Sequence, residues 1–75
     1  MTAEATSAAY WRTRLGRKVS LRFRLHDDAS HPFSEAIGMV ASVEEGENPV
    51  LVSVVNRRGE TTTFSTADVI AAKDL

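Results

Sequence analysis

The fold of this chain is decided by the stretch VSLRFRL at residues 19–25, in which apolar and polar side chains alternate without a break. Successive side chains of a β-strand point to opposite faces of the sheet, so the alternation predicts a half-buried strand over residues 17–25. The face predicted to be buried carries Val19, Leu21, Phe23 and Leu25, and the outer face carries Ser20, Arg22 and Arg24. The stretch therefore predicts a core and a basic outer surface together.

Four further strands are predicted on the C-terminal side, at residues 34–44, 50–55, 60–65 and 69–73. In the second strand the odd-numbered residues from 37 to 43 share one face, and Gly38 suggests a bend or a bulge. The third strand, VLVSVV, is apolar on both faces and is predicted to be buried on both sides. Between the third and fourth strands, the turn NRRG at residues 56–59 predicts a tight hairpin in which Gly59 adopts a positive φ.

Two helical segments complete the predicted order. A short helix over residues 8–16 places Trp11 and Leu15 on one face, over the open end of the domain, with Ser7 as its N-cap and Gly16 at its end. The sequence STAD at residues 65–68 resembles a capping box and predicts one helical turn before the last strand.

Five short strands in a chain of 75 residues suggest a closed or nearly closed barrel, which removes exposed strand edges. The predicted fold class is mainly β: a five-stranded SH3-like barrel with a short N-terminal helix and one helical turn before the last strand. Residues 1–8 are predicted to be a flexible N-terminus, and residues 9–75 are predicted to form the barrel domain. The predicted core consists of Val19, Leu21, Phe23, Ile37, Met39, Ala41, Val43, Val52, Val54, Phe64, Val69 and Ile70.

Four short segments resemble a known module: GRKVSLRFRL at 16–25, SEAIG at 34–38, NRRGE at 56–60 and ADVIAAK at 67–73. Together they resemble the small SH3-like barrel at the N-terminus of some actinobacterial acetyltransferases of the GNAT superfamily. The resemblance covers about residues 16–74. No acetyltransferase domain and no glycine-rich loop for a coenzyme pyrophosphate accompanies it, so the resemblance implies a fold and an accessory role rather than catalysis.

The composition is that of an ordinary small globular domain, with 43% apolar and 25% charged residues and a net charge of −1. The absence of cysteine excludes disulfides and thiolate metal sites and is compatible with a reducing cytoplasm. No apolar run approaches the roughly 20 residues of a membrane span, and residues 1–5 lack the features of a signal peptide. The sequence therefore predicts a cytoplasmic protein that does not contact membranes.

Residues 12–24 contain six basic side chains and no carboxylate. The candidate binding residues are Trp11, Arg12, Arg14, Arg17, Lys18, Arg22 and Arg24, together with Arg57 and Arg58 at the hairpin tip. The cations would contact phosphates, and Tyr10 and Trp11 would offer stacking surfaces. The alternative is a solvated strand face paired with Asp27, Asp28 or Glu35, and the near-neutral net charge favours it.

The chain offers little for catalysis or metal binding. His26, Asp27, Asp28 and His31 carry metal-ligand chemistry but lie in one loop without the spacing of a rigid site, so a polar loop is favoured. Serine residues near His31 lack a nucleophile elbow, and the aromatic residues are too scattered for a proline-rich peptide groove. We therefore predict no cofactor, no metal and no enzymatic activity.

The sequence favours a small non-enzymatic accessory or protein-interaction module whose specific role is unknown. The alternative is a nucleic-acid-binding small barrel that uses the basic stretch at residues 12–24. An Sm-type RNA-binding barrel would need loop signatures of its own and a ring-forming edge, neither of which the sequence pattern indicates.

Overall fold

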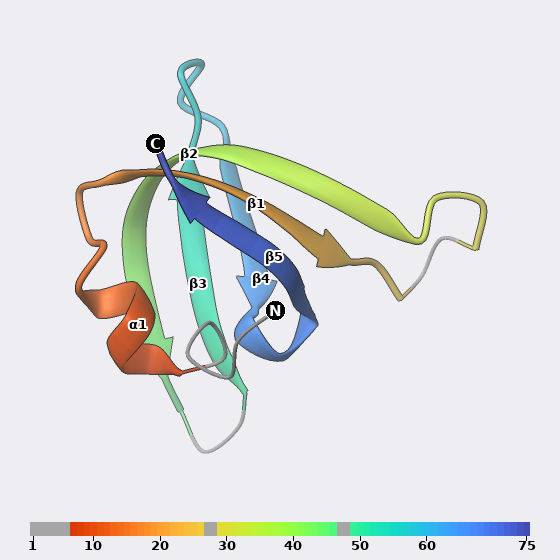
Figure 1. Ribbon diagram of the computed structural model, residues 1–75, viewed down its shortest axis with the longest axis horizontal. Coiled ribbons are helices and arrows are strands. Elements are labelled where there is room, and N and C mark those ends of the chain that lie inside the picture. Colours follow the sequence, from red (N-terminus) through yellow and green to blue (C-terminus); the bar gives the residue numbers. More distant parts are fainter. Residues whose placement is uncertain (1–6, 27–28, 47–48) are drawn as a thin grey trace.

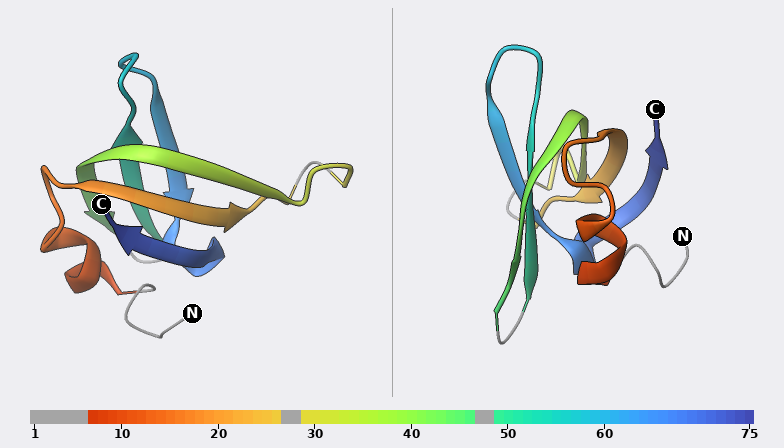
Figure 2. Two further views of the ribbon diagram at one scale, coloured as in Figure 1. Left: turned by 45° about the horizontal axis from the view of Figure 1, so that its top comes forward. Right: turned by 90° about the vertical axis from the view of Figure 1, so that its left-hand side faces the viewer.

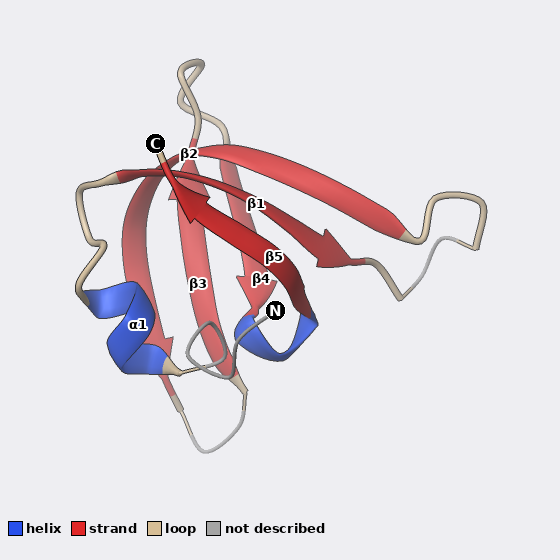
Figure 3. Cartoon of the chain, viewed as in Figure 1, coloured by secondary structure: helices blue, strands red, loops and turns tan. Residues whose placement is uncertain are grey.

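The computed structural model describes residues 7–26, 29–46 and 49–75. Its elements follow the predicted order (Figures 1 and 3). They are α1 (Ala8–Arg12), β1 (Lys18–Arg24), β2 (Phe33–Glu45), β3 (Val50–Val55), β4 (Thr61–Ser65), the 3-10 helix η2 (Thr66–Asp68) and β5 (Val69–Asp74). The mainly β fold with five strands, a short helix and one helical turn is confirmed. The predicted flexible N-terminus falls largely on residues 1–6, which lie outside the described residues.

All strand pairs are antiparallel and form one sheet in the order β4-β3-β2-β1-β5. The sheet bends strongly, so that β1 and β5 fold over toward one side of the β2-β3-β4 layer (Figure 2). Among the described residues β4 and β5 do not pair with each other, and η2 joins them at one end of the sheet. The barrel is therefore nearly closed, with an opening between its two edge strands.

Strand β1 has the register that its alternation predicts. Val19, Leu21 and Phe23 are buried, with exposed fractions of 1%, 3% and 7%. The Phe23 ring stacks on Phe64 with 5.6 Å between ring centroids, and Phe64 meets Trp11 edge to face at 5.4 Å. These aromatic contacts link β1, β4 and α1 into one core.

Helix α1 begins as predicted but ends early. The backbone N–H of Tyr10 donates to the Ser7 hydroxyl, and the helix ends at Arg12 rather than at Gly16. Trp11 is fully buried and fills one end of the core, whereas Leu15 lies outside the helix and is 47% exposed. The prediction that Leu15 shares the helix face of Trp11 is therefore wrong, because Gly16 at φ 78° turns the chain into β1.

Strand β2 faces the core with the opposite set of residues from the one predicted. Ala36 and Val40 are buried, while Ile37 and Met39 are 52% and 51% exposed. A register shift between Val40 and Ser42 then reverses the facing of the strand. Beyond this bulge the partly buried Val43 packs against the core. The predicted burial of Ile37, Met39 and Ala41 is wrong because the alternation does not continue through the bulge.

Gly38 is required for close packing rather than for the bulge. A Cβ at this position would lie 2.7 Å from the carbonyl carbon of Val55 and 3.0 Å from a methyl carbon of Val54. Only glycine lets the backbone of β3 approach β2 this closely. The close contact fixes which face of β2 turns inward.

Strand β3 is buried on one face only. Val52 and Val54 are buried, whereas Leu51, Ser53 and Val55 on the other face are only partly buried, so the predicted burial on both sides is wrong. The hairpin and the helical turn are confirmed. Gly59 has φ 82°, and the Ser65 hydroxyl accepts from the backbone N–H of Ala67 at the start of η2. Ile70, predicted to be core, is only partly buried.

Replacing Phe23 with alanine should lower the free energy of unfolding by about 3–5 kcal/mol, because the substitution leaves a cavity beside Phe64. Urea denaturation followed by circular dichroism measures the loss. The matched control is Ile37→Ala, which removes an apolar side chain from the exposed face and should cost less than about 1 kcal/mol. Equal losses in the two variants would contradict the observed facing of β1 and β2.

Candidate interaction surface

Three of the six basic residues between 12 and 24 are paired with carboxylates in the fold. Arg12 contacts Glu45 at 3.0 Å, Arg14 contacts Asp74 at 2.9 Å, and Arg22 contacts Glu35 at 2.8 Å. The partners come from β2 and β5, far along the chain. The sequence offered a strand face with paired charges as the alternative to a binding site, and Arg22 with Glu35 is such a pair. Arg12 and Arg14, which precede the strand, are paired as well.

Arg14 is part of the structural framework. Its guanidinium donates to both carboxylate oxygens of Asp74, at 2.9 and 3.3 Å, and to the carbonyl oxygen of Tyr10 at 2.8 Å. It also lies over the Tyr10 ring, 3.6 Å from the centroid. The Arg14 side chain therefore connects α1 to the end of β5. Its charge is neutralised by Asp74 and it covers one face of the Tyr10 ring, so neither group is available to a ligand.

The other basic candidates come from separate parts of the fold. Among the described residues no ion pair involves Arg17, Lys18 or Arg24, which lie before, at the start of and at the end of β1. Arg57 and Arg58 are exposed on the hairpin between β3 and β4. Trp11 is fully buried, so its ring offers no stacking surface. The structure thus does not gather all the predicted residues into one patch.

The three-strand surface of β5, β1 and β2 that points away from the core, here called the outer face, brings a different set together. Cross-strand pairing places Arg24 opposite Phe33, Ser20 between Ile37 and Lys73, and Lys18 opposite Met39. The described residues of this face are Lys18, Ser20, Arg22, Arg24, Phe33, Glu35, Ile37, Met39, Ala71 and Lys73. Basic side chains on β1 therefore run beside the apolar row of β2, which consists of Phe33, Ile37 and Met39 and is interrupted by Glu35.

Sequence reasoning missed the apolar half of the outer face. Phe33, Ile37 and Met39 are 50%, 52% and 51% exposed. Large apolar side chains in an alternating strand normally predict the buried face, so the pattern assigned Ile37 and Met39 to the core. The one signal for the true facing is Gly38, because a glycine between them would suit a close backbone contact on the inner side.

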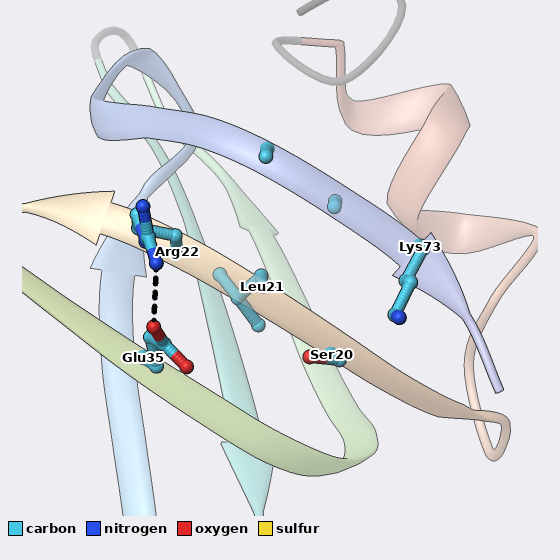
Figure 4. A pocket seen from close by; sticks show the side chains of 7 residues that line it. Ser20, Leu21, Arg22, Glu35 and Lys73 are labelled. Atoms are coloured by element: carbon cyan, nitrogen blue, oxygen red, sulfur yellow. Dashed lines mark hydrogen bonds and ion pairs between the residues drawn. The ribbon is translucent and has the colours of Figure 1, made fainter.

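A hollow of about 350 Å³ lies on the outer face between β1 and β5 (Figure 4). Its lining consists of Ser20, Leu21, Arg22, Glu35, Ala71, Ala72 and Lys73. The small side chains of Ala71 and Ser20 leave the space open, and the longer side chains of Arg22 and Lys73 stand at its two ends. The hollow has room for a side chain of a bound partner.

The loop after β1 does not bring the four candidate metal ligands, His26, Asp27, Asp28 and His31, into a shown group among the described residues. His26 contacts Asp68 of η2, with 2.7 Å between Nε2 and Oδ1. Within residues 7–26, 29–46 and 49–75, no three histidine, aspartate or glutamate side chains are grouped to hold a metal ion. Asp27 and Asp28 lie outside the described residues.

The described part of the chain has no helix long and apolar enough to cross a membrane.

Replacing Arg14 with glutamine should lower the free energy of unfolding by about 1–2 kcal/mol, because it removes a bidentate ion pair and a cation–π contact. Arg12→Gln serves as the matched control. It breaks one exposed ion pair and should cost less than about 0.5 kcal/mol. Thermal melts of both variants measure the difference. A loss for Arg12→Gln as large as that for Arg14→Gln would show that Arg14 has no special structural role.

Comparison with known proteins assigns the domain type. The family model of the Rv0428c N-terminal Sm-like domain matches residues 13–73, which include β1 to β4 and nearly all of β5. The comparisons with curated proteins and with solved structures gave no match. The match shows an Sm-like domain, although the sequence pattern indicated neither the loop signatures nor the ring-forming edge of an Sm-type RNA-binding barrel. The chain belongs to the Rv0428c N-terminal Sm-like domain family.

Proposed function

We propose that this chain is a non-enzymatic protein-interaction module that binds its partner through the outer face. The observation that carries the proposal is the row of half-exposed Phe33, Ile37 and Met39 on β2. Ile37 and Met39 are neighbours on one face of β2, and Phe33 lies further along the same face, beyond Glu35. Exposed apolar side chains grouped in this way mark interaction sites in small proteins.

The composition of the outer face also supports a protein partner. Phenylalanine, methionine and arginine are enriched in protein interfaces, and this face presents Phe33, Met39, Arg22 and Arg24 together. All four side chains are exposed on the outside of the domain. A partner covering them would remove apolar surface from water, which is the main driving force of association.

The resemblance to the N-terminal barrel of some actinobacterial acetyltransferases supports an accessory role. In that role the module would recruit or position another protein and carry out no chemistry itself. The membership in an Sm-like family is consistent with this, because such small β domains commonly serve in protein or RNA interactions. We extend the proposal to a cytoplasmic location.

Introducing charge into the apolar row should abolish partner binding without unfolding the domain. Ile37→Glu/Met39→Glu places two carboxylates on half-exposed positions, and the thermal midpoint should stay close to that of the parent. The parent chain on beads should retain a protein from nuclease-treated lysate, and the variant should lose it. The matched control, Ala9→Glu/Ala67→Glu, adds the same charge at exposed sites of α1 and η2 and should retain the partner. Equal retention by the parent and the face variant would refute the proposal.

A second candidate function, binding of single-stranded nucleic acid, is favoured by Arg17, Lys18 and Arg24. Within the described residues these cations have no ion-pair partner, so they remain available to phosphates. The buried Trp11 and the covered Tyr10 weaken this candidate, since sequence-tolerant binding of single strands depends on exposed stacking rings.

Because the protein proposal is favoured, oligo(U) RNA should show no salt-dependent binding in fluorescence anisotropy at low ionic strength. Binding through the three free cations would instead weaken with salt, with a log–log slope of about −0.7 for each phosphate contacted. Such a slope, lost in Lys18→Gln/Arg24→Gln and kept in Arg57→Gln/Arg58→Gln, would replace the proposed function with the second candidate.

A further inference from the structure

The hollow between β1 and β5 forms because long and short side chains alternate across the two paired strands. Ser20 pairs with Lys73 and Arg22 pairs with Ala71, so a long side chain faces a short one at each of two neighbouring positions. Two cations consequently stand diagonally across a floor of small residues. Figure 4 shows the Lys73 side chain and the Arg22 guanidinium at opposite ends of this floor.

The outer face differs in charge from the rest of the molecule. Lys18, Arg22, Arg24 and Lys73 contribute four positive charges and Glu35 one negative charge, which gives +3 for the face. The whole chain has a net charge of −1. Because the two sides of an interface usually carry opposite charge, the positive outer face indicates an acidic partner surface.

Arg22 is held in place to accept a second carboxylate. Glu35 binds one terminal nitrogen of its guanidinium at 2.8 Å, and no described residue contacts the other nitrogens. Arg22 and Glu35 both line the hollow, so the pair lies at its edge. A carboxylate of a partner would then bind the remaining edge of the guanidinium, a geometry that arginine offers and lysine does not.

The apolar row beside these cations distinguishes a polypeptide from a nucleic acid. Ile37 and Met39 offer aliphatic contact but no stacking platform, and Phe33 is the one aromatic ring among the described residues of the outer face. A peptide segment that carries both carboxylates and aliphatic side chains would pair with the cations of β1 and β5 and also cover the apolar side chains of β2. A ribose–phosphate strand would satisfy the cations and leave Ile37 and Met39 exposed to water.

We propose that the partner bound by the outer face presents an acidic, apolar peptide segment. One carboxylate binds Arg22 at one end of the hollow, a second binds Lys73 at the other, and an aliphatic side chain rests on Ala71 and Ser20 between them. This inference rests on the proposed function and adds to it the chemistry of the partner.

Selection from a random dodecapeptide library on the immobilised full chain tests the inference. The expected peptides combine aspartate or glutamate with leucine, isoleucine or phenylalanine. Added to ¹⁵N-labelled protein, they should shift the amide signals of Ser20, Arg22, Ala71 and Lys73. Lys73→Glu should weaken their binding at least about tenfold, because it sets like charges against each other. The matched control Arg57→Glu makes the same charge change on the hairpin and should leave binding within about twofold.

The outcomes separate the inference from the proposed function. Apolar peptides without acidic residues that shift the same amides, and that bind Lys73→Glu as tightly as the parent, would overturn the inference and leave the outer face as a protein interface. Selected peptides that shift amides elsewhere would overturn both, as would failure to enrich any peptide. Oligo(U) RNA that shifts the amides of Arg22 and Lys73 would overturn both in favour of nucleic-acid binding.

Discussion

Strand β2 must serve two different neighbours along its length, and this constraint sets the rest of the structure. Its residues 33–39 pair with β1 and its residues 39–45 pair with β3. The sheet bends within β2, and the bulge between Val40 and Ser42 lets the strand keep an apolar side chain inward on both sides of the bend. Gly38 completes the arrangement, because the Val55 carbonyl lies where a side chain would otherwise stand. The buried Val40 then meets the core that α1 closes with Trp11.

The same constraint produces the candidate surface. Once Ala36 and Val40 face inward, Ile37 and Met39 have to face outward, whatever their hydrophobicity. Their neighbours across the β1 pairing are Ser20 and Lys18. An apolar row and a basic row therefore lie side by side because of how the sheet is folded, and the candidate interface is a direct consequence of the strand register.

Local patterns in the sequence predicted the local features of the fold. The strict alternation in β1, the Asn56–Gly59 hairpin and the Ser65 cap each depend on residues within a few positions, and each is observed. The facing of β2 was not predictable in this way, since both faces of residues 36–40 carry apolar side chains and the decision comes from contact with β3. The ion pairs are likewise non-local. Arg14 finds Asp74 sixty residues away, and Arg12 finds Glu45 thirty-three residues away, so a count of charges between 12 and 24 overstates the free positive charge.

Subtracting the paired cations changes which residues define the surface. Arg14 is committed to the framework, and Arg12, the last residue of α1, is paired with Glu45. The basic groups that remain on the outer face are Lys18, Arg24, the free edge of Arg22, and Lys73, which no run of basic residues marks in the sequence. Lys73 belongs to the surface only because β5 pairs with β1 in a register that sets it opposite Ser20. The proposed binding face therefore depends on strand pairing as much as on composition, and the basic stretch points to this face only after the cations paired within the fold have been left out.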